Sequence, residues 1–285
     1  MTAHAERFDS GTGAPLLRVR DLHKHFPGHG GLLARAGEPL AAVTGVSFDI
    51  ARGRTLGLVG ESGCGKTTLA RMIVGLYAPT SGEILLEGER MTAVAAQWCS
   101  RRRSVQMIFQ DSHASLDPRY TVARTLREPL DVHAIGAAGE RNARVRELID
   151  AVGLPAGALG RYPHELSGGQ RQRVGIARAL ALEPKLIVAD EPVSSLDVSV
   201  RAQILALLAS LQRERGIAFL LISHDLAVVQ HMSHDVAVMH LGKIVEQAPV
   251  EELYRAPRHP YTQTLLAAVP TLTVGEGSER GQTVL

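Results

Sequence analysis

Short apolar runs alternate with segments of helical periodicity along most of this sequence. The runs are rich in Val, Ile and Leu and give way to polar or glycine-rich stretches, which is typical of buried strands. We predict such strands at residues 56–59, 105–109, 186–191, 219–223 and 235–241. Between the strands, apolar residues recur at helical spacing, as they do at Val145, Leu148, Ile149 and Val152. This alternation predicts an α/β fold with a mostly parallel sheet, whose ligands lie at the carboxyl ends of the strands.

Two regions differ from this alternation. Strand-like segments dominate the N-terminal part, and we predict them at residues 16–26, 42–50 and 83–87. Strand-like runs then disappear between residues 112 and 165, where helical periodicity indicates a helical insertion. We expect residues 1–15 to form a disordered N-terminal tail and residues 271–285 a C-terminal tail. The folded domain would then span residues 16–270.

A glycine-rich loop between the strand at 56–59 and the next helix carries the clearest chemistry. Gly60, Gly65, Lys66 and Thr67 fit the pattern G-x-x-x-x-G-K-[ST], which is typical of a phosphate-binding loop. Glycines allow backbone N–H groups to turn toward a phosphate, and the helix N-terminus adds partial positive charge. Lys66 would reach the β- and γ-phosphates, and the Thr67 hydroxyl would bind Mg²⁺. The alternative is a turn that only connects strand to helix.

A second glycine-rich helix start follows the helical insertion. Ser167, Gly168, Gly169 and Gln170 open a segment of helical periodicity, so a hydroxyl and free N–H groups could form a second anion site. The alternative is an ordinary helix capped by serine. Two successive glycines are costly in a helix unless something approaches the backbone closely.

Polar side chains follow three of the predicted strands. Asp190 and Glu191 end an apolar strand, where an aspartate would bind Mg²⁺ and a glutamate would polarise the attacking water. The alternative is a pair of exposed acids. Gln110 could contact a metal-bound water or cap a loop, and His224 could contact the γ-phosphate or be an ordinary strand-end histidine. Phe26, which ends the first predicted strand, could stack on a nucleobase or belong to the core.

The composition of the 285 residues limits the alternatives. Hydrophobic residues make up 45% and charged residues 21%, as in ordinary globular proteins. A net charge of +2 is too small to indicate a nucleic-acid partner. One of the two cysteines, Cys64, lies in the glycine-rich loop, so we expect no structural disulfide. The polar first 13 residues lack the apolar core of a signal peptide, and no apolar run reaches about 18 residues.

In their order along the chain, these motifs resemble those of ATP-binding-cassette (ABC) ATPases, and residues 166–170 read LSGGQ, the signature motif of that family. The resemblance covers about residues 16–270. It implies a P-loop NTPase core with a mostly parallel sheet, an antiparallel β subdomain and a helical insertion. It also implies that ATP binds to the loop residues Gly60, Glu61, Ser62, Gly63, Cys64, Gly65, Lys66, Thr67 and Thr68. Phe26 takes the position of the aromatic residue that stacks on adenine, where relatives often have tyrosine.

The same resemblance assigns catalytic and metal-binding roles. Glu191 resembles the catalytic glutamate, His224 the switch histidine and Gln110 the glutamine of the Q-loop. Thr67, Gln110 and Asp190 would bind Mg²⁺. Residues Ser167, Gly168, Gly169 and Gln170 would close over ATP held by another subunit, because two cassettes of this family pair head to tail.

The resemblance also implies partners. We expect a second ABC ATPase subunit, identical or paralogous, and two membrane permease subunits, one of which would place a coupling helix against the helical insertion. An extracytoplasmic solute-binding protein would act through the permeases, and nucleic acid would not be a partner. The protein would then lie peripherally on the cytoplasmic face of the cell membrane.

A finer resemblance is to the ATP-binding subunits of oligopeptide and dipeptide importers, a group that includes nickel importers. It is carried by residues 108–111, 115–119, 161–165 and 259–262, the last of which read HPYT. Some members hold an iron–sulfur cluster near the C-terminus, but no cysteine follows Cys99 here, so we expect none. The alternatives are import of nickel or another small solute, and a soluble ABC ATPase acting on nucleic acid or ribosomes. Soluble relatives usually have tandem cassettes, long coiled coils or zinc-binding cysteines, none of which this sequence shows.

Overall fold

The computed structural model of this protein describes residues 14–27, 39–91, 101–111 and 115–268. The C-terminal tail expected at residues 271–285 lies outside these ranges, as do all but the last two residues of the N-terminal tail expected at residues 1–15. Within the described ranges, no helix is both long enough and apolar enough to cross a bilayer.

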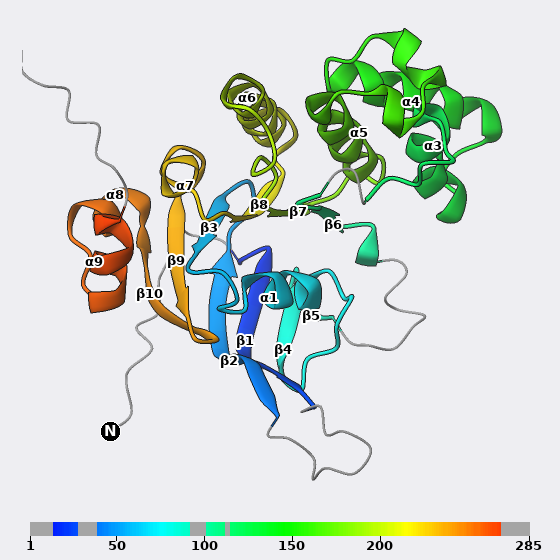
Figure 1. Cartoon of the computed structure of the whole chain (residues 1–285). Coiled ribbons are helices and arrows are strands. Elements are labelled where there is room, and N and C mark those ends of the chain that lie inside the picture. Colours follow the sequence, from blue (N-terminus) through cyan, green and yellow to red (C-terminus); the bar gives the residue numbers. More distant parts are fainter. Residues whose placement is uncertain (1–13, 28–38, 92–100, 112–114, 269–285) are drawn as a thin grey trace, which may run out of the picture.

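A six-stranded sheet forms the centre of the molecule (Figure 1). In spatial order it contains β10 (Lys243–Pro249), β9 (Asp235–His240), β3 (Thr55–Val59), β8 (Ala218–Ile222), β7 (Leu186–Asp190) and β6 (Val105–Ile108). Five of these strands are parallel, and β10 pairs antiparallel with β9. Strands β3, β7 and β8 are buried at every position, which explains their continuous apolar runs. The predicted α/β fold with a mostly parallel sheet is confirmed.

The predicted antiparallel β subdomain is a four-stranded sheet in the order β2-β1-β4-β5. Its strands are β2 (Leu40–Ile50), β1 (Leu17–Phe26), β4 (Ser81–Leu86) and β5 (Glu89–Arg90). Helix α1 (Lys66–Ile73) lies between this sheet and the central sheet, and one hydrophobic cluster contains residues of all three. Helices α6 (Val198–Arg215) and α7 (Leu226–Met232) pack on the opposite face of the central sheet.

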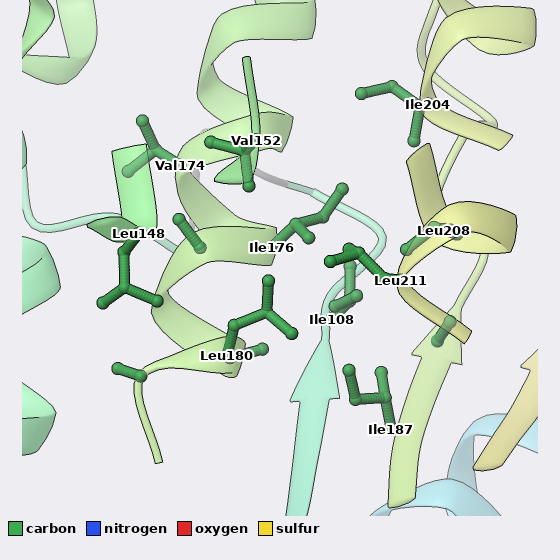
Figure 2. Close-up of a cluster of buried hydrophobic side chains, with 14 of the residues drawn as sticks. Ile108, Leu148, Val152, Val174, Ile176, Leu180, Ile187, Ile204, Leu208 and Leu211 are labelled. Carbon is green, nitrogen blue, oxygen red and sulfur yellow. The ribbon is translucent and has the colours of Figure 1, made fainter. Parts of the chain in front are cut away.

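The predicted helical insertion contains α3 (Val122–Val132) and α4 (Ala138–Ala151), with 3₁₀ turns at Ala156–Gly160 and Pro163–Glu165. Helix α5 (Gly168–Leu180) packs against both helices and against β6. Figure 2 shows the resulting core, in which Ile176 and Leu180 of α5 lie between Leu148 of α4 and Ile108 of β6. The helical part therefore shares one continuous apolar cluster with the central sheet. The insertion's expected boundary at residue 112 lies outside the described residues.

The C-terminal part continues past the last strand that the hydrophobic pattern predicted. Strand β10 is half-exposed at most positions, so its sequence lacks the continuous apolar run of a buried strand. Helices α8 (Val250–Arg255) and α9 (Pro260–Ala267) follow it and form a small apolar cluster with β9. These elements lie at the edge of the central sheet beside β10 (Figure 1).

Candidate nucleotide site

The predicted phosphate-binding loop connects β3 to α1 and packs directly against two other strands. A Cβ atom on Gly60 would lie 2.1 Å from the carbonyl oxygen of Met239, and one on Gly65 would lie 2.3 Å from that of Ala42. Both glycines also have a positive φ, at 148° and 112°. The neighbouring strands β9 and β2 therefore require glycine at both positions, and their carbonyl groups fix the path of the loop.

Lys66 and Thr67 begin helix α1 directly after this loop. Lys66 is buried, with 6% of its surface exposed, and its Nζ donates to the carbonyl oxygens of Gly60 at 2.6 Å and Glu61 at 2.7 Å. The Thr67 hydroxyl donates to the Asp190 carboxylate at 3.4 Å. An ammonium group and a hydroxyl thus lie together at a helix N-terminus, where the helix dipole favours an anion.

Asp190 ends β7 and is 4% exposed. Burial raises the pKa of its carboxyl group, the Thr67 hydroxyl lowers it, and the negative charge of Glu191 raises it further. A hydroxyl and a buried carboxylate are the oxygen ligands that Mg²⁺ prefers, and a cation would offset the cost of burying this charge. The donor set therefore fits the predicted magnesium site.

Gln110, Glu191 and His224 follow three adjacent strands, and their side chains meet. Gln110 Nε2 donates to Glu191 Oε2 at 2.8 Å, and His224 Nδ1 lies 3.2 Å from Glu191 Oε1. The Gln110 contact joins residues 81 positions apart in the sequence. The parallel register of β6, β7 and β8 places all three at one edge of the sheet, next to Asp190. The structure thus brings together the three residues predicted to be catalytic.

The backbone of Glu191 is in an unusual conformation. Its φ is 47°, in the left-handed region that side chains other than glycine rarely adopt. Its N–H donates to the carbonyl oxygen of Ile222 at 2.9 Å, and its own carbonyl accepts from the Ser194 hydroxyl at 3.2 Å. Strained residues held by such contacts are concentrated at functional sites. The hydrogen bonds keep the Glu191 carboxylate between Gln110 and His224.

The second predicted anion site is the first turn of α5. Ser167 Oγ accepts from the Gln170 N–H at 3.3 Å, and Gln170 Oε1 accepts from the Ser167 N–H at 3.0 Å, which makes a capping box. A Cβ on Gly169 would lie 2.4 Å from Val200 Cγ1 of α6, whereas one on Gly168 would make an ordinary 3.5 Å contact. Packing against Val200 within the chain therefore explains why residue 169 is a glycine. Packing does not explain the glycine at position 168, where close approach of a ligand would.

The remaining predicted ATP ligands are Phe26 and the other residues of the phosphate-binding loop. The Phe26 ring meets Tyr77 edge to face at 5.6 Å, with Lys24 Nζ 5.1 Å from its centroid. Its stacking on a base stays a prediction. The other loop positions differ in exposure: Glu61, Ser62 and Gly63 are exposed, Cys64 is buried and Thr68 is half-buried.

One contact to the loop comes from a residue outside the predicted site. The Tyr261 hydroxyl of α9 accepts a hydrogen bond from the Glu61 N–H at 3.0 Å. The HPYT segment that contains Tyr261 stood out in the sequence, but 200 positions separate the two residues. No local signal relates them.

A cavity of about 770 Å³ opens beside the site, between α1, β6 and the helical part. Thr67, Gln110 and Asp190 line one side of it. Leu76 and Val132 line it as well, and these apolar side chains are 55% and 74% exposed. The cavity therefore extends from the Gln110 end of the site to two exposed apolar side chains.

Two family models match the chain. The model described as ABC transporter matches residues 43–194, which include the phosphate-binding loop, LSGGQ and Glu191. The model described as oligopeptide/dipeptide transporter, C-terminal region, matches residues 245–283.

Curated relatives and solved structures agree with these matches. The chain is 49% identical over 272 residues to the oligopeptide transport ATP-binding protein AppF of Bacillus subtilis, covering 95% of this chain and 82% of AppF. It is 52% identical to the glutathione import ATP-binding protein GsiA of Escherichia coli, covering 96% of this chain but only 44% of GsiA, less than half of that relative.

Among solved structures, the dimeric ATP-binding cassette MJ0796 bound to ADP and Pi aligns with a TM-score of 0.72 and 28% identity, covering 82% of this chain and 98% of MJ0796. The cassette cbiO1 of Clostridium perfringens aligns with a TM-score of 0.74 and 27% identity, covering 85% of this chain and 91% of cbiO1.

Proposed function

The chain belongs to the ABC transporter family, and on that premise we propose that it is the ATP-hydrolysing subunit of an importer of oligopeptides or dipeptides. The observation that supports hydrolysis most directly is the contact of Gln110 and His224 with Glu191, next to the loop that carries Lys66. The peptide substrate is supported by AppF and by the match to the oligopeptide/dipeptide C-terminal region.

ATP would lie with its phosphates against residues 60–68 and its adenine against Phe26. Lys66 would exchange its bonds to the Gly60 and Glu61 carbonyls for bonds to the β- and γ-phosphates. Mg²⁺, held by Thr67, Asp190 and Gln110, would neutralise charge on the phosphates.

Glu191 would act as the general base of hydrolysis. Its carboxylate accepts a proton from the attacking water, and the products are ADP and phosphate. Gln110 donates to one carboxylate oxygen and so orients the other toward His224. His224, whose side chain is 63% exposed, would contact the γ-phosphate. The three residues follow three adjacent strands of one sheet, so a small displacement of any one strand end would alter their alignment.

A second cassette, identical or paralogous, would complete the site. Ser167 and Gly168 lie at the start of α5, where Ser167 Oγ accepts from the Gln170 N–H and Leu196 of the same chain lies near Gly168. The dimeric form of MJ0796 is the structural relative that supports such a pair. The signature turn of each chain would cover the ATP bound to the other.

The cavity beside Gln110 is the surface we assign to a membrane permease. Its apolar lining at Leu76 and Val132 fits a coupling helix of one of two permease subunits. Gln110 lines this cavity and contacts Glu191, so it would connect permease movement to hydrolysis. The protein would then lie at the cytoplasmic face of the membrane, and a solute-binding protein would deliver peptide on the other side.

The test is peptide uptake by the whole transporter. The chain is purified with the permease subunits of the same transporter and placed in proteoliposomes with the matching solute-binding protein. We expect ATP-dependent uptake of an oligopeptide, and Glu191→Gln should lower turnover at least about 100-fold while ATP still binds. Uptake of nickel or another small solute, with no uptake of peptide, would contradict the proposed substrate. A chain that does not associate with permeases would contradict its proposed role in a transporter.

A further inference from the structure

The C-terminal helix α9 contacts the phosphate-binding loop directly. The Tyr261 hydroxyl accepts from the Glu61 N–H at 3.0 Å. On the other side of the same residue, the Glu61 carbonyl accepts from Lys66 Nζ at 2.7 Å. One loop residue is therefore held at its N–H by the C-terminal part and at its carbonyl by the lysine that would bind phosphate.

Several contacts fix Tyr261 in this place. The Glu246 carboxylate of β10 accepts from the backbone N–H groups of Arg258 at 2.8 Å and His259 at 3.0 Å. His259 Nδ1 in turn accepts from the Tyr261 N–H at 3.1 Å and caps α9. The Tyr261 ring lies on the ring of His240, with centroids 3.9 Å apart. Contacts from both β9 and β10 thus position the hydroxyl. A displacement of either strand would therefore move the hydroxyl relative to the Glu61 N–H.

The turn between β9 and β10 holds the other end of the loop. The Gly242 N–H donates to the Cys64 carbonyl at 3.0 Å, and the Thr44 N–H of β2 donates to the Gly242 carbonyl at 2.8 Å. The loop backbone is therefore restrained at Glu61 by α9 and at Cys64 by the β9–β10 turn. Such restraint lowers the entropy that is lost when a loop closes around a ligand.

We propose that Tyr261 is a positioning residue for ATP, through which the C-terminal region sets the nucleotide affinity of the phosphate-binding loop. This inference rests on the proposed nucleotide site. Tyr261 hydrogen-bonds to the loop, and its interactions in the described part of the chain are with Glu61, His240 and His259 and with none of Gln110, Glu191 or His224, so it acts on binding and leaves the hydrolytic step unchanged. Tyr261 belongs to the region that the oligopeptide/dipeptide C-terminal family model matches, so this region would influence ATP binding.

The test compares two tyrosines of the same apolar cluster. Tyr261→Phe keeps the ring on His240 and removes only the hydroxyl. Tyr254→Phe in α8 removes a hydroxyl that donates to the Leu226 carbonyl and does not touch the loop. Binding of magnesium–AMP-PNP to the full chain is measured by calorimetry, and ATP hydrolysis by the assembled transporter gives KM and kcat. We expect Tyr261→Phe to raise Kd and KM by about three- to tenfold, as for one lost hydrogen bond, with kcat near wild type and a decrease in Tm no larger than that of Tyr254→Phe.

Each other outcome has a definite meaning. A wild-type Kd for Tyr261→Phe, with binding abolished by Lys66→Ala, overturns the role of Tyr261 and leaves the proposed function intact. Equal weakening by Tyr261→Phe and Tyr254→Phe also overturns it, because general loosening of the C-terminal part would then be the cause. Wild-type binding by Lys66→Ala would instead overturn the nucleotide site itself.

Discussion

The phosphate-binding loop and the signature turn are both glycine-containing helix starts, yet the chain builds them differently. In the loop, Gly60 and Gly65 are pressed against carbonyl groups of two strands, and Lys66 is buried. In the signature turn, Ser167 is exposed, and the capping box pairs the N–H groups of Ser167 and Gln170 within the turn. The conformation of the loop is thus fixed by contacts within its own chain. The signature turn is also stable by itself, and in the proposed function it would contribute to a site only when a second cassette meets it.

This difference shows that two similar sequence patterns can have different physical causes. Either neighbouring protein atoms or a bound ligand can require a glycine, and the sequence pattern alone does not distinguish these two causes. The contacts do separate them, because Gly169 faces Val200 at a distance no Cβ could keep, whereas Gly168 has room for one.

The largest predicted effect tests whether the loop and the signature turn of different chains form one site. Lys66→Ala disables the loop, and Gly168→Asp places a negative charge where phosphate would lie. Each variant alone should lower ATP hydrolysis at least about 100-fold. In a pair that contains one chain of each kind, one site keeps an intact loop and an intact signature turn. We therefore expect activity to return in mixed pairs.

Mixed pairs can be isolated with a different affinity tag on each variant, and their hydrolysis compared with that of each variant paired with itself. Gly168→Asp alone should keep wild-type affinity for magnesium–AMP-PNP as a single chain, because its own loop is intact. An inactive mixed pair would argue that both halves of the site belong to one chain.

A smaller effect separates the two glycines of the signature turn. Gly169→Ala forces a methyl group against Val200 Cγ1 and should lower the free energy of unfolding by about 1–3 kcal/mol. Gly168→Ala makes an ordinary contact and should stay within about 0.5 kcal/mol of wild type. Urea denaturation of the full chain measures both.

Val200→Ala provides the control for this pair. It should reduce the cost of Gly169→Ala, so that the double variant is more stable than the sum of the single effects predicts. Equal stability of Gly168→Ala and Gly169→Ala would show that packing does not distinguish the two positions.

The sequence predicted the elements that a local pattern of residues determines. Strands β7 and β8 are apolar throughout because both of their faces are buried, and parallel strands bring Glu191 and His224 to one edge. Strand β10 was not predicted, because a half-exposed edge strand has no continuous apolar run. The contact between Tyr261 and Glu61 was also beyond prediction, since it depends on the placement of α9 against a loop 200 positions away.

The smallest predicted effect compares one carboxylate from each region by its dependence on pH. Asp190, beside the phosphate-binding loop, has a raised pKa because it is buried. Asp197, which caps α6 next to the signature turn, has a lowered pKa because the Val200 N–H and the Ser199 hydroxyl donate to it. The folded state therefore binds the Asp190 proton more tightly than the unfolded state does, and the Asp197 proton less tightly.

The two substitutions should consequently change stability in opposite directions. Ionised Asp190 costs stability as the pH rises through its raised pKa, so Asp190→Asn should increase the Tm at pH 7. Ionised Asp197 adds stability that is lost as the pH falls below about 4 through its lowered pKa, so Asp197→Asn should decrease the Tm at pH 7. Both differences from wild type should shrink as the pH falls, and the difference for Asp190→Asn should shrink first, because the Asp190 carboxyl binds its proton at the higher pH. A decrease in Tm for Asp190→Asn at pH 7 would mean that contacts of the carboxylate, such as that with Thr67, outweigh the cost of its burial.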